Sequence, residues 1–190
     1  KHPNKKLFKE IKEQFHLSDD DFKSVKTTGD ETISFKKKTA LKPKHIEAFE
    51  KISGKDNVSV NEYDRLKYST GKTVEEAINL RNGKPGPVSD LIIHPKNINE
   101  IAAIIKLCNK EKIPVYVYGG GSSVNFGFRP SLGGVTLVMN THMNKILELN
   151  ELNQTVTVEA GIMGPDLERT LNNAKEIYKS EINYTCGHFP

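Results

Sequence analysis

The feature that most constrains this chain is a run of three consecutive glycines directly after a predicted buried strand. The run is Gly119-Gly120-Gly121, the strand before it is residues 115–118, and Ser122-Ser123-Val124-Asn125 follows. Glycine lets a backbone take positive φ angles and come close to a ligand. Consecutive N–H groups in such a turn converge into a concavity that binds anions, and the two serines add hydroxyl donors. A diphosphate is therefore the natural ligand for this turn.

Two well-known phosphate-binding motifs do not fit it. A P-loop needs Gly-Lys-Ser or Gly-Lys-Thr at a fixed spacing, and none follows Gly121. The dinucleotide-binding pattern Gly-x-Gly-x-x-Gly is out of phase here, and no clear helix begins behind the glycines. Taken alone, a glycine-rich turn after a strand is more often structural than functional. The neighbouring sequence has to decide between these two interpretations.

The residues before the turn alternate between strand and helix patterns. Residues 88–93 predict a short strand and residues 97–112 a helix, with Asn97 as N-cap and Glu100 as the carboxylate of its first turn. Residues 115–118 predict the next strand. Such a βαβ unit predicts parallel pairing of its two strands and a right-handed crossover.

The residues after the turn predict antiparallel structure. Strands are expected at 134–139, 146–149 and 155–160, and the turn Leu152-Asn153-Gln154 favours a hairpin between the last two. A helix is expected at 165–173, with Pro165 in its first turn. The predicted fold class is therefore α+β, a βαβ unit followed by antiparallel strands.

The first third of the chain predicts a mainly helical extension. Apolar residues recur at helical spacing in three stretches, 7–15, 44–52 and 73–80. The sequence Asn82-Gly83-Lys84-Pro85-Gly86-Pro87 then breaks the pattern. We place the main boundary there, with an N-terminal extension and connector at 1–85 and a second domain at 86–190.

Composition argues against several classes of protein. The formal net charge is only +4, and the lysine run 36–38 has Phe35 beside it but no further aromatic residue interleaved, so no nucleic-acid partner is expected. The two cysteines, Cys108 and Cys186, fit no metal-ligand spacing and form no disulfide framework, which favours a reducing compartment and predicts no metal site. No transmembrane segment is predicted. Because the chain begins at Lys1 and not at a methionine, the sequence leaves open whether a targeting peptide has been removed.

The order of the motifs resembles a known family. Residues 113–124 look like the pyrophosphate-binding loop of the vanillyl-alcohol oxidase, or PCMH-type, FAD-binding domain. Residues 89–101 are similar to the opening strand and helix of that domain, residues 139–146 to its next strand and bend, and residues 158–168 to its hairpin end and following helix.

Two further stretches narrow this resemblance. Residues 68–83 and residues 185–190 are similar to segments of the alkyldihydroxyacetonephosphate synthases and their bacterial relatives. The second of these looks like the beginning of a second FAD-binding loop, which would be completed beyond Pro190. We therefore expect residues 1–190 alone to retain FAD weakly and to be inactive, and we assign no catalytic residue.

The resemblance implies FAD as cofactor and assigns roles to twelve positions. The residues that would wrap the FAD diphosphate are Val117, Tyr118, Gly119, Gly120, Gly121, Ser122, Ser123 and Val124. Asn140 and Gly161 would lie along the adenosine side, and His188 and Pro190 would lead toward the flavin. Some members of the family attach FAD covalently to a histidine of the first loop. Ser122 stands at that position here, which predicts noncovalent FAD.

The leading functional prediction is the FAD-binding part of a flavin-dependent oxidoreductase that acts on a small-molecule hydroxy acid or alcohol. The alternative within the family is alkyldihydroxyacetonephosphate synthase chemistry, in which an alkyl group replaces an acyl group. An alternative of another class is a non-catalytic nucleotide- or phosphate-binding module. A cytoplasmic location is expected, or a peroxisomal or membrane-peripheral one for a eukaryotic ether-lipid enzyme. The sequence is compatible with a homodimer but does not specify the oligomeric state.

Overall fold

A four-stranded sheet forms the centre of the larger unit of the protein. The computed structural model describes residues 7–23, 33, 35 and 37–186. The strands are β1 (Val58–Ser59), β2 (Leu91–Ile93), β3 (Val115–Tyr118) and β4 (Val135–Val138), in the order β1-β2-β4-β3. β2 and β4 are buried along their whole length, as the two central strands of a sheet covered on both faces must be.

The predicted βαβ unit is present, with one difference in strand pairing. Helix α5 (Ile98–Glu111) connects β2 to β3, and these two strands run parallel, but β4 lies between them and pairs with both. The strand that follows the glycine-rich turn is thus one of the two central strands of the sheet. β1 pairs antiparallel with β2, so the first 85 residues contribute a strand to this sheet.

Helix α5 begins as its sequence predicts. The Asn97 side chain accepts a hydrogen bond from the Glu100 N–H at 3.0 Å, which satisfies one of the unpaired amides of the first turn. The Glu100 carboxylate accepts from the Lys96 N–H at 3.0 Å, one residue before the position that a capping box would use. Ile104 and Cys108 lie fully buried on the face that packs against the sheet.

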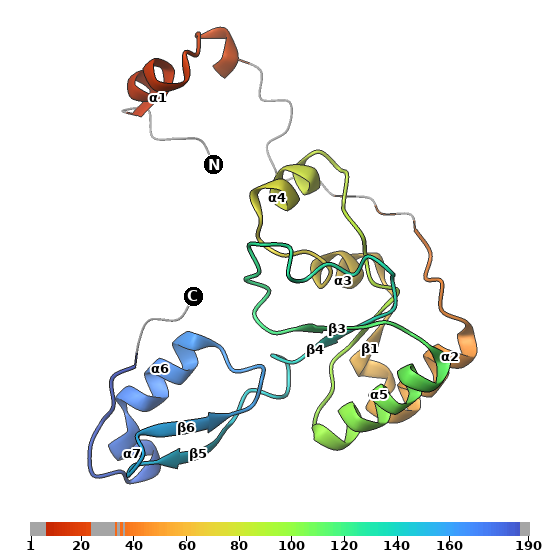
Figure 1. The fold of residues 1–190 in the computed structure, drawn as a ribbon, viewed down its shortest axis with the longest axis vertical. Coiled ribbons are helices and arrows are strands. Elements are labelled where there is room, and N and C mark those ends of the chain that lie inside the picture. Colours follow the sequence, from red (N-terminus) through yellow and green to blue (C-terminus); the bar gives the residue numbers. More distant parts are fainter. Residues whose placement is uncertain (1–6, 24–32, 34, 36, 187–190) are drawn as a thin grey trace.

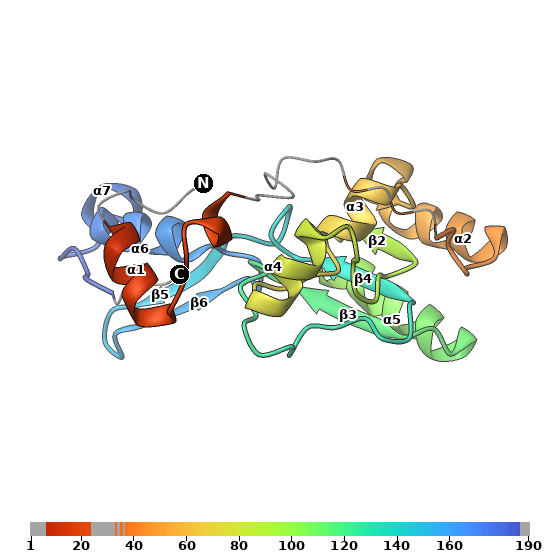
Figure 2. The same ribbon diagram turned by 90° about the horizontal axis from the view of Figure 1, so that it is seen from above.

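Helices α2 (Pro43–Ser53) and α5 lie side by side on one face of the sheet (Figures 1 and 2). Their apolar side chains and those of the strands form the main core. Its fully buried members include Phe49, Leu91, Ile93, Ile104 and Val135. Helices α3 (Glu62–Lys67) and α4 (Val74–Arg81) belong to the connector, and Tyr68, directly after α3, packs against a second cluster formed by Ile92, Tyr118 and Val138.

A buried ion pair joins the connector to the sheet. Arg65 of α3 is 1% exposed and Asp90, just before β2, is 5% exposed; the Arg65 Nη2 and Asp90 Oδ1 atoms are 3.9 Å apart. Arg65 Nε donates to the Ser89 carbonyl at 2.8 Å. Asp90 accepts from the N–H of Ala40 at 2.9 Å and from the N–H of Gly134 at 2.8 Å. One carboxylate therefore holds the extension, the connector and the start of β4 together.

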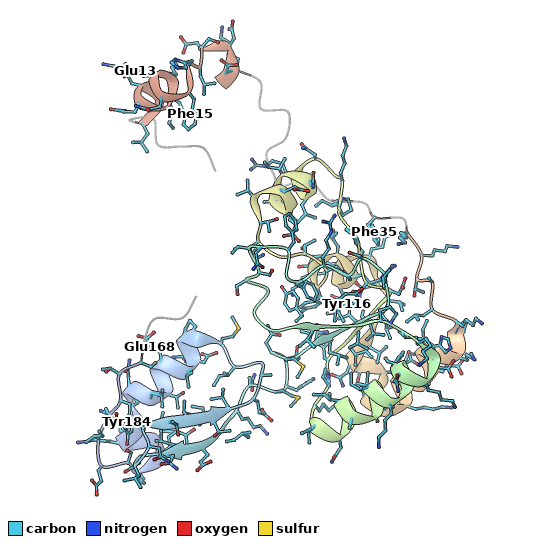
Figure 3. All side chains as sticks on the ribbon, in the orientation of Figure 1. Glu13, Phe15, Phe35, Tyr116, Glu168 and Tyr184 are labelled. Atoms are coloured by element: carbon cyan, nitrogen blue, oxygen red, sulfur yellow. The ribbon has the colours of Figure 1, made fainter. Side chains whose placement is uncertain are left out.

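The remainder of the described chain forms a smaller unit. Strands β5 (Ile146–Asn150) and β6 (Thr155–Val158) make the predicted antiparallel hairpin, and α6 (Gly164–Asn172) and α7 (Ala174–Tyr178) follow. Figure 1 shows this unit beside the β4 end of the larger one, and Figure 3 shows Glu168 and Tyr184 in it, with Phe35 and Tyr116 in the larger unit.

The described N-terminal residues and one short connector complete the fold. Helix α1 (Phe8–Phe15) is followed by the 3₁₀ turn η2 (Asp20–Phe22), and the 3₁₀ turn η3 (Lys55–Asn57) leads into β1. Of the helices that the structure describes, none has the length and apolar character to cross a bilayer.

Candidate cofactor-binding site

The glycine-rich turn leaves β3 at the carboxyl end of the parallel strands. In open sheets of this kind, ligands bind at that edge. Gly120, Ser122 and Val124 are exposed, whereas Gly121 and Ser123 are half-buried. Among the described residues, no group accepts a hydrogen bond from the backbone N–H of any residue from 119 to 124. The turn therefore presents a series of unused donors, the property that an anion site needs.

The turn is held at both ends by its carbonyls. The Tyr118 carbonyl accepts from the Met139 N–H at 2.9 Å, and the Ser123 carbonyl accepts from the Lys72 N–H at 2.7 Å. Because these two carbonyls are directed to other segments and the N–H groups of the turn are not used, the turn can offer partial positive charge without any lysine or arginine in it.

The ring of Tyr118 packs against the turn at Gly121. Gly121 has φ +69°, and a Cβ at this position would overlap the Tyr118 ring, so only glycine fits. The ring packs edge-on against Tyr68 at 5.2 Å and Phe128 at 5.4 Å between centroids. Burial raises the pKa of the Tyr118 phenol; the charge of Tyr68 adds to this and Lys67 opposes it. Tyr118 is therefore a neutral, fixed platform for the turn.

Two other segments converge on the turn. A Cβ at Gly120 would lie 3.4 Å from Met163 Cε, and one at Gly119 would lie 3.8 Å from the Ala160 carbonyl. The segment that carries Ala160 and Met163 joins β6 to α6. The glycine-rich turn and this segment, which are about forty residues apart in the sequence, therefore face one another.

Gly161 fastens the hairpin end to the end of β4. A Cβ at Gly161 would overlap the Met139 carbonyl, so the two backbones lie in direct contact. The Gly161 N–H donates to the Met143 carbonyl at 2.8 Å. The structure therefore brings together the three sequence-predicted segments around Gly119, Asn140 and Gly161.

His94 also lies at this edge of the sheet, where the sequence predicted only a strand end. Its Nδ1 is 2.6 Å from the Thr141 hydroxyl, and its ring lies 5.3 Å from that of Tyr68. Burial lowers the pKa of His94; Asp64 opposes the shift, and His142 and Lys67 add to it. The neutral imidazole thus links the ends of β2 and β4 to the connector.

The connector residues 69–76 were missed as part of the site. Besides the Lys72 bond to Ser123, the Glu76 carboxylate accepts from the Gly71 N–H at 3.0 Å and from the Thr73 N–H at 3.1 Å. Burial opposes ionisation of Glu76, but these bonds, the Thr73 hydroxyl and the charge of Arg129 hold its pKa below the ordinary value. The pattern Thr73-x-x-Glu76, a capping box, was the available sequence signal.

A small cavity lies between the connector and the far end of the loop. Its volume is about 20 Å³, room for about one water molecule, and Glu76, Phe126 and Arg129 are among the residues that line it.

The structure gives no placement for the last two residues of the predicted site. His188 and Pro190 lie outside the described residues. Cys108 is in the core, where burial raises its pKa to about 11, and Cys186 is half-buried; neither forms a disulfide. In the described part of the chain, no group of three or more His, Cys, Asp and Glu side chains is arranged to hold a metal ion.

Comparison with known proteins identifies related sequences. The chain is 31% identical over 127 residues to the glycolate oxidase subunit GlcD of Bacillus subtilis (strain 168), a match that covers 67% of this chain and 25% of that protein. It is 25% identical over 195 residues to the alkyldihydroxyacetonephosphate synthase of Trypanosoma brucei brucei, covering 99% of this chain and 30% of that protein. The chain thus spans less than a third of the length of these relatives.

Solved structures agree with the sequence matches. A crystal form of alkyldihydroxyacetonephosphate synthase superposes with a TM-score of 0.70 at 25% identity, over 76% of this chain and 28% of that one. The structure of p-cresol methylhydroxylase, at 20% identity and a TM-score of 0.57, has the same fold. The family model described as "FAD binding domain" matches residues 89–186, which include β2, the glycine-rich turn and the hairpin, and the chain therefore belongs to the FAD-binding domain family of FAD-linked enzymes.

Proposed function

We propose that this chain binds FAD noncovalently, with the diphosphate on the backbone of residues 117–124, as the cofactor-binding part of an oxidoreductase that acts on a hydroxy acid or alcohol. The observation that carries the proposal is the series of N–H groups from Gly119 to Val124 that find no acceptor among the described residues. Asn140 and Gly161, on the two neighbouring segments, would support the adenosine side. His188 and Pro190 would approach the flavin.

The residues present fit a diphosphate. A ligand with two adjacent charged phosphates needs several donors within a short stretch of backbone, and the turn supplies six consecutive ones, residues 119–124, together with the Ser122 and Ser123 hydroxyls. The exposed Gly120 leaves the backbone open to close approach. Tyr118 keeps the turn in place from the opposite side.

The same turn supports noncovalent attachment. Ser122 occupies the position at which the sequence resemblance places the histidine of covalent relatives, and its hydroxyl is a poor nucleophile without an adjacent base. His94 bonds Thr141 and His142 bonds Asn57, so each of these two rings has a partner other than Ser122.

When bound, FAD supplies the redox chemistry by accepting a hydride from the substrate carbon. The chain's own part is to bind and orient the cofactor: the turn neutralises the diphosphate charge, and the segments around Asn140 and Gly161 fix where the cofactor can lie. The Bacillus subtilis relative is named for the oxidation of glycolate, a hydroxy acid, which supports that substrate class.

A second candidate is the acyl-for-alkyl exchange of alkyldihydroxyacetonephosphate synthase. It is favoured by the match to the Trypanosoma brucei brucei enzyme, which extends over 99% of the chain and so includes the N-terminal extension that the family model leaves out. We propose a cytoplasmic location for the oxidoreductase, and a peroxisomal or membrane-peripheral one if the exchange is the activity.

The visible absorption spectrum of the full-length gene product tests the proposal. We expect a flavin spectrum whose chromophore appears in the supernatant after acid precipitation. Reduction of the flavin by glycolate or lactate under anaerobic conditions would support the oxidoreductase, whereas turnover of acyl-glycerone phosphate with a fatty alcohol would support the exchange. A colourless protein that takes up no added FAD would overturn the proposal and favour a phosphate-binding module without enzymatic activity.

A further inference from the structure

The carboxylate of Glu76 makes more hydrogen bonds than helix capping requires. In a capping box, the side chain at the third helical position accepts only from the N-cap backbone. Glu76 does this for Thr73 at 3.1 Å and also accepts from the Thr73 hydroxyl at 2.7 Å. Its other oxygen accepts from the N–H of Gly71 at 3.0 Å, two residues before the N-cap. Glu76 therefore fixes a turn outside the helix as well as the helix itself.

This second turn, residues 71–73, lies against the glycine-rich turn that follows β3, and the two meet through backbone atoms. The Lys72 N–H, which stands between the two residues that Glu76 holds, donates to the Ser123 carbonyl at 2.7 Å. A Cβ at Gly71 would lie only 2.6 Å from the same carbonyl oxygen. The position of Ser123 is thus set by residues 71–73, and their conformation is set by Glu76.

The direction of one loop amide follows from this contact. In a trans peptide the carbonyl and the next N–H point in opposite directions, and the described chain contains no cis peptide. With the Ser123 carbonyl directed at Lys72, the Val124 N–H points away from the connector. Among the described residues, that N–H is one of the unused donors of the loop.

We propose that Glu76 is a positioning residue for the diphosphate of the cofactor, acting through the 71–73 turn and the Ser123 carbonyl to aim the loop amides. The inference rests on the proposed function, because it takes the diphosphate of FAD as the ligand of the loop. The negative charge of Glu76 is taken up by three N–H and O–H donors, with Arg129 nearby, and is not left facing the phosphates.

The test separates helix capping from loop positioning. Glutamine also completes a capping box, so Glu76→Gln keeps one acceptor for Thr73 but turns an NH₂ group toward the Gly71 N–H. Glu75→Gln is the matched control: Glu75 lies in the same first turn of α4, loses the same charge and is exposed. Gly71→Ala disturbs the same contact from the connector side, because its Cβ would meet the Ser123 carbonyl oxygen, and it serves as a second variant that keeps the Glu76 carboxylate.

The measurement is the dissociation constant of FAD, and of riboflavin as a ligand without diphosphate, with the apo form of the full-length gene product. Loss of one well-placed hydrogen bond costs about tenfold in affinity. We expect Glu76→Gln and Gly71→Ala each to weaken FAD binding about tenfold, Glu75→Gln to stay within about twofold, and riboflavin binding to be unchanged throughout.

Two outcomes would overturn the inference while leaving the proposed function standing. One is wild-type FAD affinity in both Glu76→Gln and Gly71→Ala. The other is an equal loss for FAD and riboflavin, which would indicate a general structural effect. Absence of FAD binding by the wild-type protein would instead refute the proposed function.

Discussion

Replacement of Asp90 by alanine should be among the most damaging single changes in this protein. Its carboxylate accepts from two backbone N–H groups, those of Ala40 and Gly134, and faces the buried guanidinium of Arg65 at 3.9 Å. The Asp90→Ala variant leaves all three groups without that acceptor. The pair lies in the interior, at 1% and 5% exposure, so bulk solvent does not reach the groups that lose their partner.

The size of the loss can be worked from these contacts. A buried N–H left without an acceptor costs about 1–3 kcal/mol, and removal of one member of a buried ion pair costs about 3–5 kcal/mol. The contributions overlap because they share one carboxylate, and the 3.9 Å separation is long for an ion pair. We therefore expect the free energy of unfolding to fall by about 3–4 kcal/mol, a large part of the 5–15 kcal/mol that is typical of a whole domain.

Urea unfolding followed by circular dichroism measures this change. Asp166→Asn is the control, because Asp166 pairs with Arg169 on an exposed helix surface, where such pairs contribute about 0–1 kcal/mol. A loss below about 1 kcal/mol for Asp90→Ala would refute the reasoning, since it would mean that Arg65 and the two N–H groups find other partners at little cost.

Three further changes test the core and the site. Phe49→Ala, at a fully buried position between α2 and the sheet, should lower the free energy of unfolding by about 3–5 kcal/mol in the same urea assay. Gly161→Ala should displace the Met139 carbonyl and weaken FAD binding by the full-length gene product, and unchanged FAD affinity would show that this contact is not needed. Because burial raises the pKa of the Cys108 thiol from 9.0 to about 11, its contribution to stability is present below pH 9 and is lost as the pH rises from 9 to about 11. The Cys108→Val variant should therefore lose less stability than wild type over that interval, and parallel curves would count against a buried neutral thiol.

Local patterns predicted the elements well because each depends on neighbouring residues. The helical pattern of residues 97–112, with Asn97 as its N-cap, predicted α5, and the turn at 152–154 predicted the β5–β6 hairpin. The order of motifs placed the glycine-rich turn at the end of a parallel strand, where the structure has it.

Relations between distant segments could not be predicted in the same way. The position of β4 between β2 and β3 depends on which strand edges find partners, and nothing within residues 134–139 specifies it. β1 has only two residues and carries too little pattern to be recognised. The contact of Lys72 with Ser123 joins two backbones, so no side-chain type marks it in the sequence.

The central place of β4 has a consequence for how the chain reaches this structure. β2 and β3 precede it in the sequence, yet neither has a parallel neighbour until β4 is inserted between them. Until then both would expose unpaired strand edges, and the residues of β2 are entirely apolar. Chains whose pairing depends on distant segments fold slowly and are open to aggregation in the interval. A chain that ends within the glycine-rich turn would therefore lose more than a ligand site. It would lack β4, and β2 and β3 would have no strand between them to pair with.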